Sequence, residues 1–154
     1  MKIAIGADHA GFELKDKIVV ELKKLGHDVL DLGTNSAEAV DYPDFAVKVG
    51  DAVAAKGVER GIVVCGSGVG ACVAANKVRG VRAGLCHDTF SAHQGVEDDD
   101  VNVLCLGARV VGQELAFEIL RVWLKAKFSH AERHMRRLNK VLAIEAQSLS
   151  GGRP

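Results

Sequence analysis

Residues 60–71 read RGIVVCGSGVGA, an apolar run that ends at Cys65 and passes at once into a glycine-rich loop. The run has the length and the Val and Ile content of a strand that is buried on both faces. Three glycines in five positions predict a tight turn, and a helix is expected to follow it. Strand, glycine turn and helix in this order are typical of a parallel α/β sheet, in which ligands bind beyond the carboxyl ends of the strands.

Apolar runs of strand length recur along the chain and alternate with stretches of helical period. This alternation predicts right-handed βαβ units and one parallel sheet covered by helices on both faces. The last two helical stretches, Gln113–Lys127 and His130–Gln147, have no strand between them. We therefore predict an α/β fold, a Rossmann-like three-layer α/β/α sandwich with a five-stranded parallel sheet and an extra C-terminal helix. The predicted strands are Lys2–Gly6, His27–Leu32, Arg60–Cys65, Val81–Cys86 and Asn102–Leu106.

Length and composition limit what the chain can be. Its 154 residues suffice for one core, which excludes a nucleotide domain joined to a separate substrate domain. We predict a single domain over residues 1–147 and a flexible tail over residues 148–154, which read SLSGGRP. Twenty basic residues balance twenty acidic ones, so no overall field draws the chain to nucleic acid or to an anionic membrane. The four cysteines lack CxxC spacing and the chain shows no signal sequence, so we expect free thiols and a cytoplasmic protein.

The loop from Cys65 to Gly70 is the strongest candidate for chemistry. Its glycines let several backbone N–H groups point at one spot, where the start of the next helix adds positive potential. This arrangement predicts a cradle for an oxyanion or a phosphate. Cys65 stands at its edge, beside groups that favour a thiolate, so it is expected to remove a proton or to attack a carbon. The alternative for Cys65 is a buried structural thiol, the role expected of Cys72, Cys86 and Cys105.

The same loop meets the dinucleotide-binding pattern as Gly66-x-Gly68-x-x-Ala71, with Asp88 about twenty residues later. A nucleotide-binding module is therefore an alternative function. The dinucleotide pattern does not require a thiol, however, whereas this loop begins with one.

Asp8 and His9 follow the first predicted strand and open a helix. Asp8 is either a ligand of the bound molecule or the N-cap of that helix. His9 either contacts a hydroxyl or a phosphate, or is a solvated surface side chain.

Two further groups of polar residues are candidates for binding. His87, Asp88 and the acidic run over 97–100 are either solvated or hold a divalent cation. Arg133 and Arg137 lie four residues apart on the last helix, which places them on one face. Two guanidinium groups on one face are able to clamp a phosphate, and the alternative is ordinary surface arginine.

Five motifs together closely resemble the type B ribose-5-phosphate isomerases, a family that includes the galactose-6-phosphate isomerase subunits. The resemblance covers nearly the whole chain, keeps the order of the motifs, and is more specific for the family than for the sugar. It implies aldose–ketose isomerisation of a phosphorylated sugar, with ribose 5-phosphate and ribulose 5-phosphate as the expected pair. The motifs are GADHAGFELK at 6–15, DYPDFA at 41–46, VVCGSGVG at 63–70, NVLCLGARVVG at 102–112 and ERHMRRL at 132–138.

The resemblance implies roles for individual residues. Cys65 is the base that moves the proton, Ser67 sits beside it and tunes it, and the glycine loop holds the oxygens of an enediolate. Arginines of a second subunit complete the phosphate site, which implies a homodimer with shared active sites, or a tetramer. No metal and no organic cofactor is implied. The implied substrate contacts are Asp8, His9, Tyr42, Gly66, Ser67, Gly68, Val69, Gly70, Asp99, Arg109, Arg133 and Arg137.

Two positions decide how far the family pattern applies. Some relatives lack the cysteine and use a glutamate just after the glycine loop; this chain has Ala71 there, which leaves Cys65 as the expected base. The family's ring-opening histidine is replaced by Asp98. An aspartate is ionised at neutral pH and accepts a proton more readily than it donates one. Asp98 is expected to take the catalytic role, with His9 or His87 as alternatives, and the missing histidine leaves a non-catalytic subunit open as a function.

Overall fold

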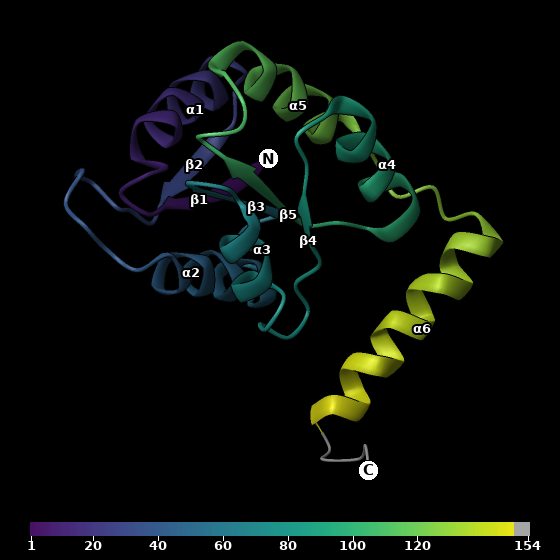
Figure 1. Ribbon diagram of the computed structural model, residues 1–154. Coiled ribbons are helices and arrows are strands. Elements are labelled where there is room, and N and C mark those ends of the chain that lie inside the picture. Colours follow the sequence, from purple (N-terminus) through teal and green to yellow (C-terminus); the bar gives the residue numbers. More distant parts are fainter. Residues whose placement is uncertain (150–154) are drawn as a thin grey trace.

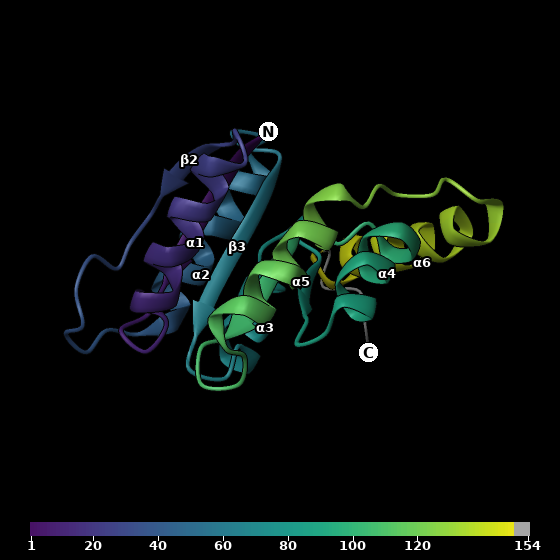
Figure 2. The same cartoon turned by 90° about the horizontal axis from the view of Figure 1, so that it is seen from above.

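The computed structural model describes residues 1–149. A five-stranded parallel sheet in the order β2-β1-β3-β5-β4 runs through the molecule, with helices on both faces (Figures 1 and 2). This confirms the predicted α/β/α sandwich. The strands are β1 (Lys2–Ala7), β2 (Asp28–Asp31), β3 (Arg60–Cys65), β4 (Ala83–Leu85) and β5 (Val103–Gly107). The helices are α1 (Phe12–Lys24), α2 (Tyr42–Ala54), α3 (Val69–Ala75), α4 (Thr89–Asp99), α5 (Gln113–Lys125) and α6 (Glu132–Leu149).

Alternate residues of each central strand pack into two separate cores. On β3, Ile62 and Val64 join the core under α1, α4 and α5, whereas Val63 and Cys65 join the core under α2 and α3. Successive strand residues point to opposite faces, so a strand covered on both faces must be apolar throughout. This is why β1, β3 and β5 were recognisable as uninterrupted apolar runs.

The two edge strands are shorter than predicted. The run Val81–Cys86 forms only the three-residue strand β4, which pairs with β5 alone. Asn102 Oδ1 accepts a hydrogen bond from the Arg82 N–H at 2.8 Å, so this N–H is bound by a side chain, whereas the Arg82 carbonyl still accepts the Asn102 N–H at 3.0 Å. An edge strand has one neighbour, and its ends therefore lose ladder hydrogen bonds first.

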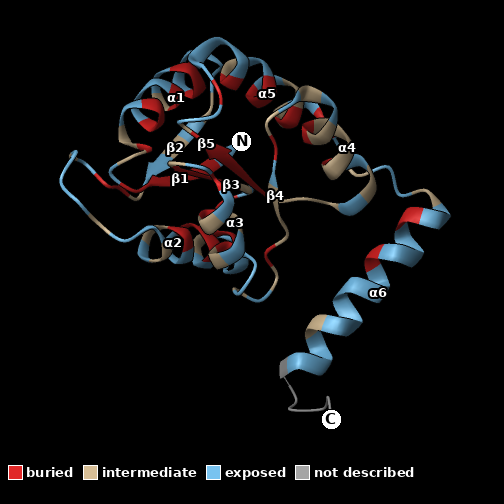
Figure 3. Ribbon diagram, viewed as in Figure 1, coloured by how far each residue is buried: buried red, intermediate tan, exposed pale blue. Residues whose placement is uncertain are grey.

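Helix α6 extends away from the sandwich (Figure 1), and most of its surface is exposed (Figure 3). It continues through Ser148 and Leu149, which the sequence analysis placed in the tail. The rest of the predicted tail, residues 150–154, lies outside the described residues. Over residues 1–149 no helix is both long and apolar enough to cross a membrane.

Candidate active site

The loops at the carboxyl ends of β1 and β3 enclose a cavity of about 400 Å³. Eight of the residues predicted from the sequence meet there, although they come from segments far apart in the chain. Ala10 and Val110 also line the cavity, and sequence reasoning missed them because small apolar residues carry no chemical signal. The predicted residues in the lining are Asp8, His9, Tyr42, Cys65, Gly66, Ser67, Gly70 and Arg109.

Cys65 is the last residue of β3 and its sulfur borders this cavity. The side chain is only 4% exposed, because Val63 and the small residues of α3 pack behind it. Its Sγ accepts a hydrogen bond from the Gly68 N–H at 3.1 Å. The thiol is therefore both part of the core and in contact with the cavity, within reach of a main-chain donor.

The glycine loop keeps its shape in part because a side chain does not fit at Gly68. Gly68 has φ 78°, and a Cβ there would stand 2.8 Å from the backbone carbon of Leu106. The Ser67 hydroxyl accepts a hydrogen bond from the Val69 N–H at 3.3 Å, so the turn is also held by a side chain. The N–H groups of Gly70 and Ala71 belong to the first turn of α3 and have no acceptor within the helix. The loop therefore presents free donors beside Cys65.

Tyr42, the first residue of α2, lies against Gly70 across the cavity. A Cβ on Gly70 would come within 2.7 Å of the tyrosine Cζ, closer than side-chain carbons approach. Glycine at this position therefore makes room for the ring.

We expect Gly70→Ala to raise the KM for a sugar phosphate by about tenfold, because the methyl group displaces the Tyr42 ring into the cavity; tenfold corresponds to about 1.4 kcal/mol of binding. Tyr42 is partly exposed, so its ring can move without unfolding the protein. Steady-state kinetics and a thermal melt measure both effects. Gly57→Ala, in an open turn far from the cavity, is the control. An unchanged KM in Gly70→Ala would show that the ring does not border the bound substrate.

Asp8 and His9 are held by backbone groups on either side of the cavity. Asp8 Oδ1 accepts a hydrogen bond from the Gly11 N–H at 2.9 Å, and Gly11 rather than Asp8 is the N-cap of α1. Asp8 therefore caps the turn that precedes α1, and the alternative in which Asp8 is the N-cap of α1 is wrong. His9 Nδ1 lies 3.2 Å from the backbone of Val40, and its Nε2 makes no hydrogen bond within residues 1–149.

Arg109 follows β5 and borders the cavity beside Gly66, where an added Cβ would stand 3.6 Å from the guanidinium carbon. Its backbone N–H donates to the Gly66 carbonyl at 2.9 Å, which fixes the two loops together. Its guanidinium pairs with no carboxylate in the described part of the chain. A second cavity of about 400 Å³ continues from Arg109 toward Lys17 and Gln113. An unpaired arginine between two cavities provides a site for an anion.

Four predicted site residues lie elsewhere. Asp98 and Asp99 end α4 just before β5 begins at Val103, whereas Cys65 pairs with Gly107 at the other end of β5. At about 3.3 Å per residue, the length of β5 alone separates them from Cys65 by about 13 Å. The sequence already carried this signal, because a segment that precedes a parallel strand lies at the amino edge of the sheet.

Arg133 and Arg137 are on α6, which packs against α4 rather than against the glycine loop. Both are exposed, and neither pairs with a carboxylate among the described residues. One chain therefore assembles only part of the predicted site.

Asp98 is already engaged within its own subunit. Its Oδ2 accepts a hydrogen bond from Gln94 at 2.7 Å, and its Oδ1 lies 3.4 Å from Nε2 of the buried His134. His87 is engaged as well, because its Nε2 accepts the Gly107 N–H at 3.1 Å. Sequence reasoning missed the contact with His134, although His134 and Leu138 have the i, i+4 spacing of a buried helix face.

Two alternatives raised by the sequence lose their geometric basis. Asp88 caps α4 by accepting hydrogen bonds from Ser91 at 2.7 Å, and the acidic run lies at the far end of that helix, about 16 Å away. Asp88 is therefore placed away from the other acids proposed for a cation. It also follows β4, which β5 separates from β3, so it is not on the strand next to the glycine loop as dinucleotide binding requires.

Cys72 differs from the buried structural thiol that the sequence predicted. It is half-buried on α3, and its pKa is lowered to about 7, mainly because the Cys105 thiol donates a hydrogen bond to its sulfur. Asn76 also donates to this sulfur, at 3.5 Å. Burial raises the pKa of Cys86 to about 11, and the pKa of Cys105 is raised by its hydrogen bond to Cys72 and by burial. Cys86 and Cys105 are buried as predicted.

Cys72 is expected to be alkylated by iodoacetamide with a rate that rises with pH and is half-maximal near pH 7, because only the thiolate reacts. Cys86 is the control, since its raised pKa keeps it a thiol throughout the range from pH 5 to 9. Mass spectrometry of the labelled peptides gives both rates. A midpoint for Cys72 near the value of an unperturbed cysteine, about 8.5, would contradict the hydrogen bond from Cys105.

A family model described as Ribose/Galactose Isomerase matches residues 3–141. The chain belongs to the ribose/galactose isomerase family. This confirms the family resemblance seen in the motifs.

Individual members of the ribose/galactose isomerase family are similar over nearly the full chain. Ribose-5-phosphate isomerase B of Escherichia coli is 47% identical over 144 residues, which cover 94% of this chain and 96% of that protein. The structure of Clostridium thermocellum ribose-5-phosphate isomerase B is 49% identical, with a TM-score of 0.94 and coverage of 96% of this chain and 99% of the other. D-erythrulose-4-phosphate isomerase of Pectobacterium atrosepticum is 44% identical over 129 residues, covering 83% and 85% of the two chains. The predicted enzyme class, aldose–ketose isomerase, is confirmed.

Proposed function

We propose that the protein interconverts ribose 5-phosphate and ribulose 5-phosphate, with Cys65 as the base that moves the proton. The observation that carries this proposal is the position of the Cys65 sulfur, which borders the cavity while accepting the Gly68 N–H at 3.1 Å. The relatives from Escherichia coli and Clostridium thermocellum are named ribose-5-phosphate isomerase B, which favours this sugar.

The reaction moves one proton between neighbouring carbons. The Cys65 thiolate takes the proton from C2 of the open-chain aldose, and the electron pair of that bond forms the C1–C2 double bond of a cis-enediolate. The C1 carbonyl oxygen becomes an oxyanion, which the free N–H groups of the glycine loop stabilise. The Cys65 thiol returns the proton to C1, and the proton of the C2 hydroxyl passes to the oxygen on C1. Asp8, His9 and Tyr42 line the cavity where they contact the sugar hydroxyls.

The phosphate is held by arginines from two chains. Arg109 borders the cavity and has no carboxylate partner among residues 1–149; Arg133 and Arg137 are equally unpaired but lie on α6, outside it. The exposed side chains of Val141 and Ile144 border a groove of about 560 Å³ between α6 and the sandwich, which fits a second copy of the chain. We infer a homodimer, or a tetramer made of two such dimers, in which α6 of one subunit completes the site of the other. All four cysteines are free thiols, which fits the predicted cytoplasmic location.

Asp98 remains the predicted residue for ring opening of the cyclic sugar, supplied by the second subunit together with Asp99. Both residues lie on the same side of the chain as α6, so one docked subunit brings them and the arginines together. The carboxylate of Asp98 also accepts a hydrogen bond from Gln94 and lies 3.4 Å from Nε2 of His134.

A coupled assay of the purified chain with aldose phosphates of four to six carbons tests the proposal. We expect the highest kcat/KM with ribose 5-phosphate and lower values with erythrose 4-phosphate and six-carbon substrates. The four-carbon substrate is included because one relative is named D-erythrulose-4-phosphate isomerase. A higher kcat/KM with another aldose phosphate would overturn the choice of sugar. No isomerisation of any substrate by the chain alone would favour a non-catalytic subunit.

A further inference from the structure

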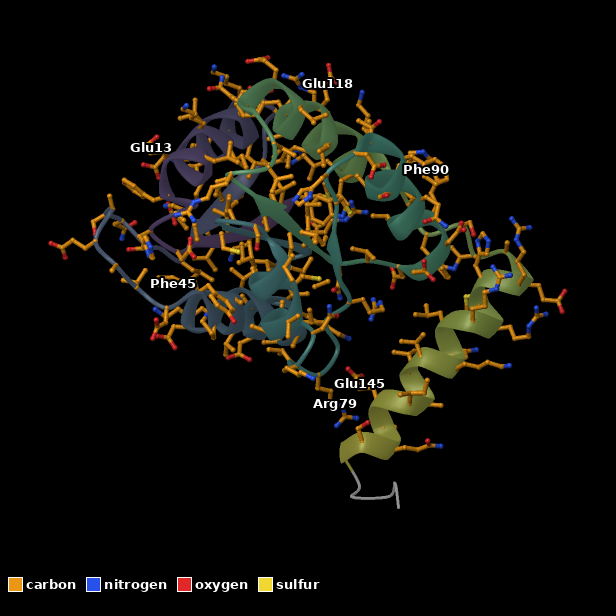
Figure 4. All side chains as sticks on the ribbon, viewed as in Figure 1. Glu13, Phe45, Arg79, Phe90, Glu118 and Glu145 are labelled. Atoms are coloured by element: carbon orange, nitrogen blue, oxygen red, sulfur yellow. The ribbon has the colours of Figure 1, made fainter. Side chains whose placement is uncertain are left out.

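Helix α6 is held to the rest of the chain by few contacts. His134 and Leu138 are the only buried side chains between Glu132 and Ser148. Toward the other end of the helix, Glu145 Oε1 accepts the Gly80 N–H at 2.8 Å, and Figure 4 shows Glu145 close to Arg79. A groove of about 560 Å³ lies between these points, so the middle of the helix is not packed against the sandwich. The direction in which α6 faces therefore depends on its attachments at His134, Leu138 and Glu145.

His134 joins α6 to the end of α4 through polar contacts on both ring nitrogens. Nδ1 is hydrogen-bonded to Ser129 Oγ at 2.6 Å, and Nε2 lies 3.4 Å from Asp98 Oδ1. Gln94 holds the other carboxylate oxygen of Asp98 at 2.7 Å, and the Ser129 N–H donates to the Glu97 carbonyl at 3.0 Å. The imidazole is 3% exposed, and Nε2 makes no hydrogen bond within the described part of the chain. A buried polar nitrogen is costly without a partner, and the Asp98 carboxylate lies within ion-pair distance of it.

The orientation of His134 determines where the neighbouring arginines point. Successive helix residues are rotated by about 100°, so Arg133 and Arg137 are about 40° apart on one face, and His134 points about 100° away from Arg133. With His134 directed into the chain, both guanidinium groups are directed out of it, and both are exposed.

We propose that His134 is a positioning residue for the phosphate site: clamped between Ser129 and Asp98, it fixes the rotation of α6 so that Arg133 and Arg137 reach the cavity of the second subunit. This inference rests on the proposed function. It gives Asp98 a task in positioning His134, besides its proposed role in ring opening.

The experiment compares three variants by kcat, by KM for ribose 5-phosphate and by the Kd for inorganic phosphate from calorimetry. His134→Ala and Asp98→Ala lose the clamp and are expected to raise the KM for ribose 5-phosphate and the Kd for phosphate about tenfold, and in His134→Ala kcat stays within about twofold of the original. Asp98→Asn keeps an amide oxygen beside Nε2, so the Kd for phosphate stays within about twofold, whereas its kcat reports separately on ring opening. Asn139→Ala, an exposed substitution one turn further along α6, is the matched control and changes none of them.

Coupling to the arginines separates positioning from a merely structural role. Arg137→Ala raises KM by itself, and adding His134→Ala to it raises KM little further, because the clamp acts through the arginines. Size-exclusion chromatography and circular dichroism confirm that the variants are folded and keep their assembly. Should His134→Ala fail to fold, Asp98→Ala against Asp98→Asn decides the question, together with His134→Gln, whose amide replaces Nε2.

Three results would overturn the inference. The first is an unchanged KM and phosphate Kd in His134→Ala while Arg137→Ala raises both. The second is full additivity of the two substitutions. The third is a Kd for phosphate in Asp98→Ala that equals the original value. The phosphate Kd is measured without turnover, so a protein that binds phosphate through the clamp but does not isomerise ribose 5-phosphate would contradict the proposed function alone.

Discussion

Cys65→Ser is expected to lower kcat for ribose 5-phosphate by about 10²–10⁴-fold, with a small change in KM. The hydroxyl of serine fits the space of the thiol, which is 4% exposed and accepts the Gly68 N–H, so the fold and the cavity are preserved. A hydroxyl is a far weaker acid than a thiol, however, and supplies no base at neutral pH. Loss of the base therefore appears in kcat.

The measurement is the coupled assay combined with exchange of the C2 proton in deuterated water. Cys65→Ser is expected to abolish both isomerisation and exchange, since both require removal of the same proton. Cys72→Ser is the matched control, because its thiol lies on α3 and does not line the cavity. Exchange at the original rate in Cys65→Ser would rule out Cys65 as the base.

Mixing Cys65→Ser with Arg137→Ala is expected to restore activity, measured at a ribose 5-phosphate concentration far below the raised KM of Arg137→Ala. Cys65→Ser alone lacks the base, and Arg137→Ala alone lacks a phosphate ligand in every site. In a mixed dimer with shared sites, one site carries both defects and the other carries neither. After random reassembly half of the dimers are mixed, so about a quarter of the original activity returns. The restored activity requires that the arginine and the cysteine of one site come from different chains.

The control mixes Cys65→Ser with Asp8→Ala, two changes in the same cavity of the same chain. In that mixed dimer one cavity lacks the Cys65 thiol and the other lacks the Asp8 carboxylate. Neither cavity is therefore intact. No activity is expected to return. Failure of the first mixture to recover, with mixed dimers shown by native mass spectrometry, would contradict the shared site.

The cavity side of the site was predictable because its residues directly follow strands. Residues 60–65 form β3 with the predicted bounds, and the glycine loop follows at its carboxyl end. In a parallel sheet every such loop reaches the same edge, so Asp8, Cys65 and Arg109 had to approach one another. The edge strands β2 and β4 were predicted too long, because local composition does not reveal that a strand has only one neighbour.

The sequence by itself determined the sheet, the glycine loop and the family, since apolar period, glycine spacing and motif order are local properties of the chain. Only the tertiary structure decided that Asp98 and Arg137 lie away from Cys65, that His134 is clamped by Ser129 and Asp98, and that Cys72 rather than another thiol contacts Cys105 with a lowered pKa. These features depend on which segments meet in space. The position of α4 beside the sheet and the packing of α6 against α4 bring these segments together. The residues of one segment alone do not reveal either arrangement.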